Sequence, residues 1–179
     1  MIDPRRRSFL RGRMAEAAAP QARIVQRPPW AVPQARFASV CDRCGDCIAA
    51  CPRKVLKAGD GGFPETDFSS RGCDFCGACE QACKPRALDR ASAQAGCGQA
   101  APQQAAWPLW QVCIAPHCLA LNKVECRVCA DACDARAIRL RPAPGGISQM
   151  QLDLAACTAC GDCVGVCPAG ALTMVEMTA

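Results

Sequence analysis

The sequence contains no tyrosine, a single histidine, three tryptophans and five phenylalanines in 179 residues. A chain of this length is expected to fold as one or two small domains, yet so few large side chains leave little material for an ordinary apolar core. No apolar run approaches the about 20 residues that a transmembrane helix requires, so the sequence predicts no membrane insertion. We therefore expect a bound group to complete the interior, and the chain to be largely unfolded without it.

The sequence also lacks the motifs of several common functions. It has no glycine-rich nucleotide or flavin motif. Its basic residues are not interleaved with aromatic ones, as they are on nucleic-acid-binding platforms. Nothing in the sequence indicates a substrate pocket or catalytic residues. We therefore predict a carrier or accessory protein that is not an enzyme and does not bind nucleic acid.

Cysteine, by contrast, is abundant, with 18 in the chain. Three segments share the spacing C-x2-C-x2-C-x3-C, which is typical of bacterial 4Fe–4S proteins, and a fourth differs only in a first gap of seven residues. In chain order, motifs 1 to 4 are Cys41, Cys44, Cys47 and Cys51; Cys73, Cys76, Cys79 and Cys83; Cys118, Cys126, Cys129 and Cys133; and Cys157, Cys160, Cys163 and Cys167. We expect the first three cysteines of each motif to bind one cluster, and the fourth to lie where a short helix starts.

Disulfides and zinc are poorer explanations of this spacing. Three cysteines within seven residues are badly placed to pair with one another. Zinc sites usually combine two C-x2-C pairs that lie well apart in the sequence, whereas motifs 1 and 4 are runs of cysteine that end in Cys-Pro, at Pro52 and Pro168. The sequence therefore predicts 4Fe–4S clusters, and the cysteines of the motifs are enough for about four of them.

In two-cluster ferredoxins, the fourth cysteine of each motif binds the cluster of the other motif. Applying this crossover within each pair of motifs predicts four sites, which we number 1 to 4. Their ligands are Cys41, Cys44, Cys47 and Cys83 for site 1; Cys51, Cys73, Cys76 and Cys79 for site 2; Cys118, Cys126, Cys129 and Cys167 for site 3; and Cys133, Cys157, Cys160 and Cys163 for site 4.

Site 3 leaves alternatives open. Cys113 competes with Cys118 for the isolated upstream ligand, His117 is a further candidate, and Cys97 also lies outside the motifs. We favour Cys118 because it leaves a seven-residue loop, which closes at a small entropic cost. Cys97 and Cys113 are then expected to be buried small residues, and His117 to be an exposed residue with no role.

The motifs form an internal duplication. It predicts an α+β fold of tandem two-cluster ferredoxin-like modules with short helices and small antiparallel hairpins. Between the two motifs of each half, a short apolar stretch is followed by Gly61-Gly62 or Gly145-Gly146 and by a second extended segment, which is a hairpin pattern. Ala87-Leu88 and Ala171-Leu172 are expected to form short strands that pair back. The predicted boundaries are a basic tail over 1–36, a first module over 37–90, an Ala/Gln-rich linker over 91–112 and a second module over 113–179.

The linker ends in its only large apolar element, Trp107-Pro108-Leu109-Trp110. Buried aromatic side chains supply much of the packing area of small domains, and exposed ones mark binding surfaces. We expect this element to pack over the second module, and the alternative is a partner-binding patch.

The tail begins with Arg5-Arg6-Arg7-Ser8-Phe9-Leu10, which resembles a twin-arginine export motif. An export signal also needs an apolar stretch and a cleavage site, and neither follows here. We therefore expect a cytoplasmic protein with a vestigial or docking motif. Residues 1–36 carry eight arginines against Asp3 and Glu16, whereas clusters at about −2 each would make the rest of the chain acidic. Such polarity favours oriented docking on a partner.

Several of these features combine in one known pattern. The chain starts with Arg-Arg-x-Phe-Leu without an export core, and then has two regular motifs, a Trp-Pro-Leu linker, a stretched motif around Val124-Glu125-Cys126-Arg127 and a last regular motif. In this the chain resembles the NapF family, the ferredoxin-type accessory proteins of periplasmic nitrate reductase systems, over essentially residues 1–175. The resemblance implies a cytoplasmic polyferredoxin that binds the precursor of the reductase catalytic subunit and assists its maturation before export, through electron transfer. The alternative is an electron-transfer subunit of a membrane-associated or cytoplasmic molybdenum oxidoreductase complex.

Overall fold

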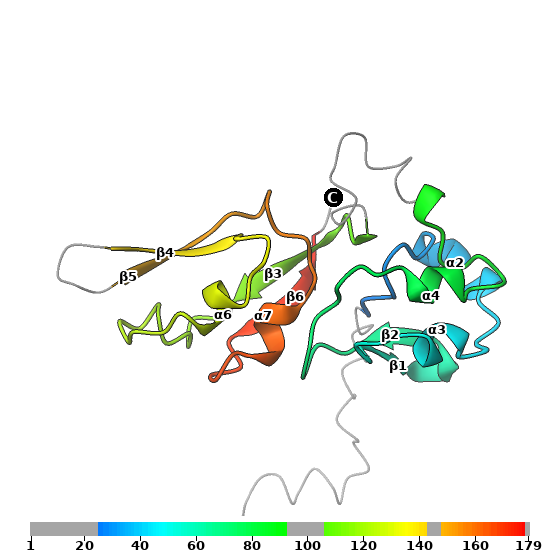
Figure 1. Ribbon diagram of the computed structural model, residues 1–179, viewed down its shortest axis with the longest axis horizontal. Coiled ribbons are helices and arrows are strands. Elements are labelled where there is room, and N and C mark those ends of the chain that lie inside the picture. Colours follow the sequence, from blue (N-terminus) through cyan, green and yellow to red (C-terminus); the bar gives the residue numbers. More distant parts are fainter. Residues whose placement is uncertain (1–24, 93–105, 143–147, 178–179) are drawn as a thin grey trace, which may run out of the picture.

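The computed structural model of the chain describes residues 25–92, 106–142 and 148–177. Figure 1 shows two bodies side by side, and we call residues 25–92 the first module and residues 110–177 the second module. Each sheet in the described residues is a single antiparallel strand pair, and the helices that contain cysteine span four residues each. The predicted α+β fold of short helices and small hairpins is confirmed. No helix within the described ranges is long and apolar enough to cross a membrane.

The first module places a hairpin between two short helices. Its elements are α2 (Gln34–Val40), α3 (Asp46–Ala49), β1 (Leu56–Ala58), the 3-10 turn η1 (Asp60–Gly62), β2 (Pro64–Thr66) and α4 (Ala78–Gln81). Strands β1 and β2 pair with Leu56 opposite Thr66. Gly61 and Gly62 make the turn with φ of 65° and 78°, a region that only glycine adopts without steric cost. The first predicted hairpin is therefore confirmed.

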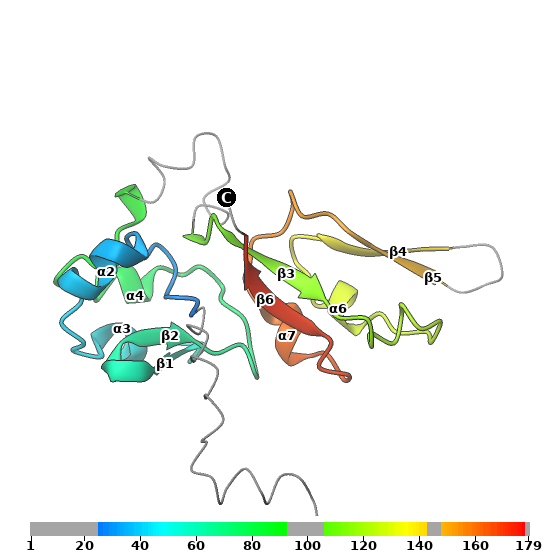
Figure 2. The ribbon, with the colours of Figure 1, turned by 180° about the vertical axis from the view of Figure 1, so that it is seen from behind.

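The second module repeats this plan and adds a longer strand pair. Its elements are β3 (Trp110–Ile114), α6 (Val128–Asp131), β4 (Ile138–Pro142), β5 (Ser148–Leu152), α7 (Asp162–Gly165) and β6 (Leu172–Glu176). Strand β4 buries Ile138 and exposes Arg139 and Arg141, as a half-buried strand does, and pairs with β5 as predicted. The predicted Gly145-Gly146 turn lies outside the described residues. Figure 2 shows this hairpin pointing away from the first module.

In each module, the segment after the last cysteine motif pairs with the segment that precedes the first motif. Strand β3 pairs with β6, with Ile114 opposite Leu172, and in the first module Ala31 bridges Leu88 in the same way. Trp30 and Val32 are buried beside this bridge. The segment 25–36 is thus part of the packed first module and not of a flexible tail, because Leu88 supplies a pairing partner that only the folded module creates.

Trp107 packs on the first module, so the expectation that the linker's apolar element covers the second module was wrong for this residue. Its ring lies 5.9 Å from Phe68 and 5.8 Å from Phe75 between centroids. Its Nε1–H donates to the Arg27 carbonyl at 2.7 Å. All five phenylalanines lie at or before Phe75, so the aromatic partners that a tryptophan favours are in the first module.

The two modules meet at the cysteine loops of motifs 2 and 4. Asp162 Oδ1 accepts from Arg53 Nη2 at 2.6 Å and from the Gly72 N–H at 2.9 Å. Beside them, the Cys73 N–H donates to the Cys160 carbonyl at 2.8 Å. Arg53 and Asp162 have side chains that are 33% and 26% exposed, so this ion pair is partly shielded from solvent.

Gly161 gives a test of this junction. A Cβ added at Gly161 would run into the Phe68 ring of the other module, at a φ of +84°. We expect Gly161→Ala to destabilise the protein by about 1–3 kcal/mol more than Gly45→Ala. Gly45 is the matched control, because it holds the same place in motif 1, has a φ of +82° and has nothing within 4 Å of the added Cβ. Anaerobic thermal unfolding with an iron assay measures the difference, and equal losses would show that the modules do not depend on this contact.

Candidate iron–sulfur sites

The cysteine loops share one backbone course. In motifs 1, 2 and 4 the residue after the second cysteine is a glycine with φ between 81° and 84°, and the short helix begins directly after it. The helix therefore contains the third cysteine and ends before the fourth; in motif 1, α3 ends at Ala49 and Cys51 follows. The expectation that the helix starts at the fourth cysteine was wrong, because the left-handed glycine turns the chain into the helix one cysteine earlier.

Four cavities are each lined by four cysteines, and the groups are those that the crossover predicts. Each cavity holds about 290–330 Å³ of empty space, including the part open to solvent. The cysteines that line them are Cys41, Cys44, Cys47 and Cys83 at site 1; Cys51, Cys73, Cys76 and Cys79 at site 2; Cys118, Cys126, Cys129 and Cys167 at site 3; and Cys133, Cys157, Cys160 and Cys163 at site 4.

The alternatives for site 3 are separated by position. Cys118 is 5% exposed and lines the cavity, whereas Cys113 is exposed on β3, opposite Thr173. The expectation that Cys113 is buried was therefore wrong, since it lies on the outward face of a strand. His117 is exposed, as expected, and Cys97 lies outside the described residues.

Asn122 explains how the stretched loop of motif 3 closes, and sequence reasoning missed it. Its Nδ2 donates to the Pro116 carbonyl at 2.7 Å and to the Cys118 carbonyl at 2.9 Å. Its backbone N–H also donates to the Cys118 carbonyl, at 3.1 Å. Asparagine commonly organises such turns, and its place inside the long gap is the signal that could have identified it.

Each of the four cavities is lined by four thiols, which is the donor set of a 4Fe–4S cluster. Within the part of the chain that the structure describes, no three Cys, His, Asp or Glu side chains converge closely enough to hold one metal ion. A tetrahedral zinc site needs four donors that converge at about 2.3 Å from the metal. Four thiols placed around an open cavity are instead suited to a larger polynuclear group.

Backbone N–H groups point at the sulfur atoms. The N–H groups of Leu88, Ala137 and Ala171 donate to the fourth cysteines of motifs 2, 3 and 4 at 3.3–3.4 Å. The residue three positions after the fourth cysteine has a positive φ in all four motifs, and these residues are Lys54, Arg86, Arg136 and Gly170. N–H···S bonds favour the negatively charged form of a thiolate or cluster, so the turns that follow motifs 2, 3 and 4 prepare sites 1, 4 and 3 for a metal–thiolate group.

Burial raises the pKa of several cysteine thiols in the absence of metal. It raises the pKa of Cys73 and Cys79 to about 12 and that of Cys47 and Cys129 to about 11. Nearby thiols of the same site add to the rise, as Cys118 does for Cys129. These thiols are therefore protonated near neutral pH until a cationic metal group replaces the protons. Binding of iron must release protons, and loading is favoured as the pH rises.

Comparison with known proteins agrees with this chemistry. A family model described as a 4Fe–4S dicluster domain matches residues 40–87 and 124–171. The chain is similar to the ferredoxin-type protein NapF of Haemophilus influenzae, at 40% identity over 96% of this chain and 94% of that protein. NapF of Escherichia coli K12 gives the same figures. The methylamine utilization ferredoxin-type protein MauM of Methylobacillus flagellatus is 30% identical over 89% of this chain and 69% of that protein.

The second match of the domain model begins at residue 124 and so leaves out Cys118. The other cysteines of the four motifs all lie inside the two matches. The place of Cys118 beside Cys126, Cys129 and Cys167 therefore rests on the cysteine spacing and on the structure, and not on the domain match.

Proposed function

Because the chain belongs to the NapF family of ferredoxin-type proteins, we propose that it is a cytoplasmic polyferredoxin that assists a periplasmic nitrate reductase. In this proposal it binds the cytoplasmic precursor of the reductase catalytic subunit and supports maturation before export, through iron–sulfur electron transfer. The chain itself is a carrier and not an enzyme. A bound 4Fe–4S cluster supplies reversible one-electron transfer.

We assign the sixteen cysteines of the motifs as ligands of four clusters, at sites 1 to 4. The assignment is supported by the four cysteine-lined cavities and by the N–H groups that point at the sulfur atoms of motifs 2, 3 and 4. Thiolates are the donors that 4Fe–4S clusters use, so the residues fit the group.

The observation that carries electron transfer is the arrangement of the sites in one row. Helices α3 and α4 join sites 1 and 2, since each contains a ligand of one site and is followed by a ligand of the other. Helices α6 and α7 join sites 3 and 4 in the same way. The Cys73–Cys160 backbone hydrogen bond connects site 2 to site 4 across the module junction. The order of the sites is therefore 1, 2, 4, 3, and covalent or hydrogen-bonded connections run along the whole row.

The proposed partner follows from the family and from the charge of the tail. The four relatives at 40% identity are NapF proteins, which by name are ferredoxin-type. Residues 1–24, which precede the first module, hold six arginines against Asp3 and Glu16, and a basic segment joined to acidic cluster modules favours oriented docking. The row of sites also suits the alternative, a permanent electron-transfer subunit of a molybdenum oxidoreductase complex.

The test compares maturation with turnover. We expect a salt-sensitive complex between this protein and the cytoplasmic precursor of the reductase, and weaker binding to the exported mature form. Replacing Cys41, Cys44 and Cys47 together by serine should lower the specific activity of the reductase without changing its amount. Cys113→Ser is the matched control, because Cys113 is exposed and lines none of the four cavities.

The opposite result would favour the permanent subunit. In that case reductase matured without this protein would be fully active, and turnover would fall only when the protein is left out of the assay. The docking role of the tail is tested by deleting residues 1–24, which keeps Gln26 and Arg27, because their carbonyls accept hydrogen bonds from Thr66 and Trp107. Normal binding of the precursor by the truncated protein would assign docking to the modules instead.

A further inference from the structure

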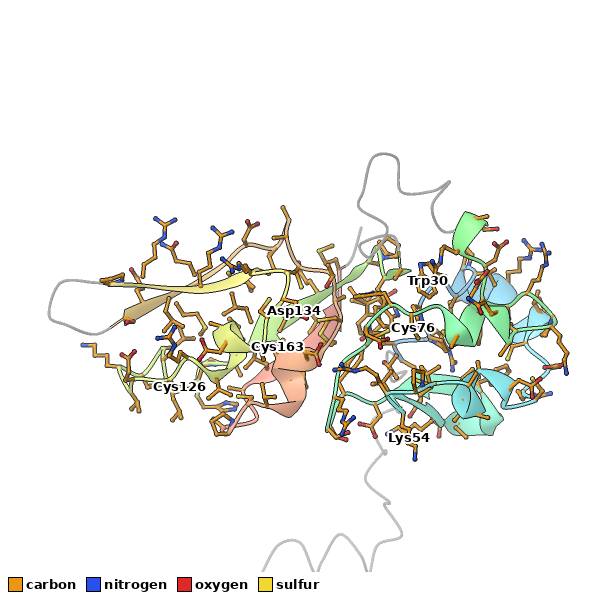
Figure 3. The ribbon with its side chains drawn as sticks, viewed as in Figure 1. Trp30, Lys54, Cys76, Cys126, Asp134 and Cys163 are labelled. Carbon is orange, nitrogen blue, oxygen red and sulfur yellow. The ribbon has the colours of Figure 1, made fainter. Side chains whose placement is uncertain are left out.

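Two residues that line site 2 each have a buried side-chain N–H group without a hydrogen-bond acceptor. The groups are Trp30 Nε1 and Arg53 Nε, and both residues line the cavity with Cys51, Cys73 and Cys76. Figure 3 labels Trp30 and Cys76 next to each other in the first module. Since a buried N–H without an acceptor costs about 1–3 kcal/mol, two such groups at one cavity indicate an acceptor that occupies it.

The other three cavities differ. Sites 1, 3 and 4 are lined by no residue of this kind: among the described residues, each buried side-chain N–H group without an acceptor belongs to a residue outside these three linings. The closest comparison is site 4, the counterpart of site 2 in the second module. Arg53 lies two residues after Cys51, and the residue two after Cys133 is Ala135. Strand β3 contributes Val112 to site 4, and no tryptophan or arginine lines that cavity.

Trp30 is held in an unfavourable backbone conformation. Its φ is +59°, which costs a non-glycine residue about 1–3 kcal/mol and is found mainly at functional sites. Its backbone is fixed on both sides, because its N–H donates to the Ala106 carbonyl at 3.0 Å and its carbonyl accepts from the Asp89 N–H at 2.8 Å. The Arg90 guanidinium carbon lies 4.0 Å from the ring centroid. The indole is therefore a fixed donor with a cation over its face.

Arg53 is also positioned by the other module. Its Nη2 is bound to Asp162 at 2.6 Å, which holds the guanidinium in place while Nε remains without an acceptor. Asp74 lines the same cavity with the opposite charge, but it is exposed and its carboxylate accepts from the Cys76 N–H. The buried groups at site 2 are thus donors, and the acidic group is exposed to solvent.

We propose that Trp30 Nε1–H and Arg53 Nε–H donate hydrogen bonds to the sulfur atoms of the cluster at site 2 and make it the most easily reduced of the four. This proposal rests on the ligand assignment given above. Hydrogen bonds to sulfur stabilise the reduced cluster, which is one unit more negative, and so raise its reduction potential. A low local dielectric strengthens the effect. The first electron that enters the protein is therefore held at the module junction.

Trp30→Phe is the main test, because phenylalanine keeps the ring and removes the N–H. We expect one cluster, the first to be reduced in the unmodified protein, to become about tenfold harder to reduce, which is ~59 mV for one electron. Trp107→Phe is the matched control, since its buried N–H already has the Arg27 carbonyl as acceptor and it lines none of the four cavities. Potentiometric titration followed by electron paramagnetic resonance measures both variants, and equal shifts or no shift in Trp30→Phe would overturn the proposal.

A spectroscopic contact measurement is independent of the potential. In a Trp107→Phe, Trp110→Phe protein, Trp30 is the only indole left. With 15N-labelled tryptophan, the first-reduced cluster should show hyperfine coupling to the indole nitrogen and to an exchangeable proton, and absence of both would overturn the proposal.

Arg53→Lys keeps the positive charge beside Asp162 and removes the Nε–H group. We expect this variant to lower the reduction potential of the same cluster, and an unchanged potential would show that Arg53 is not one of the two donors. Iron content distinguishes the failure of the ligand assignment from the failure of the present proposal. A protein that lacks the site 2 cluster contradicts the ligand assignment. A protein that binds all its clusters but shows unshifted potentials in the variants contradicts only the role of Trp30 and Arg53 as hydrogen-bond donors.

Discussion

Removal of iron by a chelator under air is expected to unfold both modules. In the second module, buried core positions are shared between apolar residues such as Ile138 and Leu172 and cysteines that line the sites, Cys129 and Cys163. Because the ligands of a metal site are brought together only in the folded chain, the free energy of cluster binding is part of the free energy of folding. Small proteins are stable by only about 5–15 kcal/mol, so the loss of this contribution is expected to unfold the chain.

Circular dichroism and proteolysis check this result module by module. Near-ultraviolet structure and the cooperative thermal transition should disappear. The second module should be cut first by trypsin, at Arg136, Arg139 or Arg141, because it lacks the aromatic cluster of the first. Trp30 and Trp107 are both buried against the first module, whereas Trp110 lies in β3 of the second module, so the fluorescence of a Trp110→Phe protein follows the first module alone. An iron-free chain that keeps a cooperative transition would show that side chains suffice as a core.

Cys118→Ala is expected to remove one cluster completely. Anaerobically prepared protein should contain about sixteen irons and as many sulfides, and the variant about twelve, because site 3 loses the buried thiol that the stretched loop supplies. Cys113→Ala and His117→Ala should keep the full content, since both residues are exposed. Iron and acid-labile sulfide analysis after reconstitution makes the measurement.

Three outcomes would contradict this prediction, and each has a separate meaning. Full iron content in Cys118→Ala would mean that another group replaces the thiol or that site 3 binds no cluster. If the unmodified protein contains only about twelve irons, and reconstitution does not raise this number, the chain binds three clusters. Site 3 then binds none, and replacement of the thiol by another group is not the explanation. Loss of iron in Cys113→Ala would assign the upstream ligand to the strand.

The local parts of the fold were predictable from the sequence. The spacing of each motif restricts its three close cysteines to one loop, and Gly61-Gly62 marks a hairpin turn, so both follow from neighbours in the chain. The α+β fold was predictable for the same reason. The grouping of cysteines at the sites needed one additional rule, the crossover between motifs, which is a property of known two-cluster ferredoxins.

The parts that sequence reasoning missed depend on residues far apart in the chain. Trp107 packs on Phe68 and Phe75 rather than on the second module, and no local pattern distinguishes the two choices. Residues 25–36 join the first module because Leu88 bridges Ala31. The proposed donors at site 2 include Trp30, which is buried. Its burial could not be predicted from the spacing of apolar residues, because the proline-rich segment around it forms no regular helix or strand.

Trp107 has a consequence for the order of events during synthesis. All ligands of sites 1 and 2 have been added to the chain once Cys83 has been made, but the ring that covers Phe75, inside motif 2, comes 24 residues later. At about 5–20 residues per second, translation leaves an interval of about 1–5 s between these two events. During this interval the ligand loop of motif 2 is complete and lacks its aromatic cover, so a cluster donor acting on the nascent chain meets a more open site than it would on the finished protein.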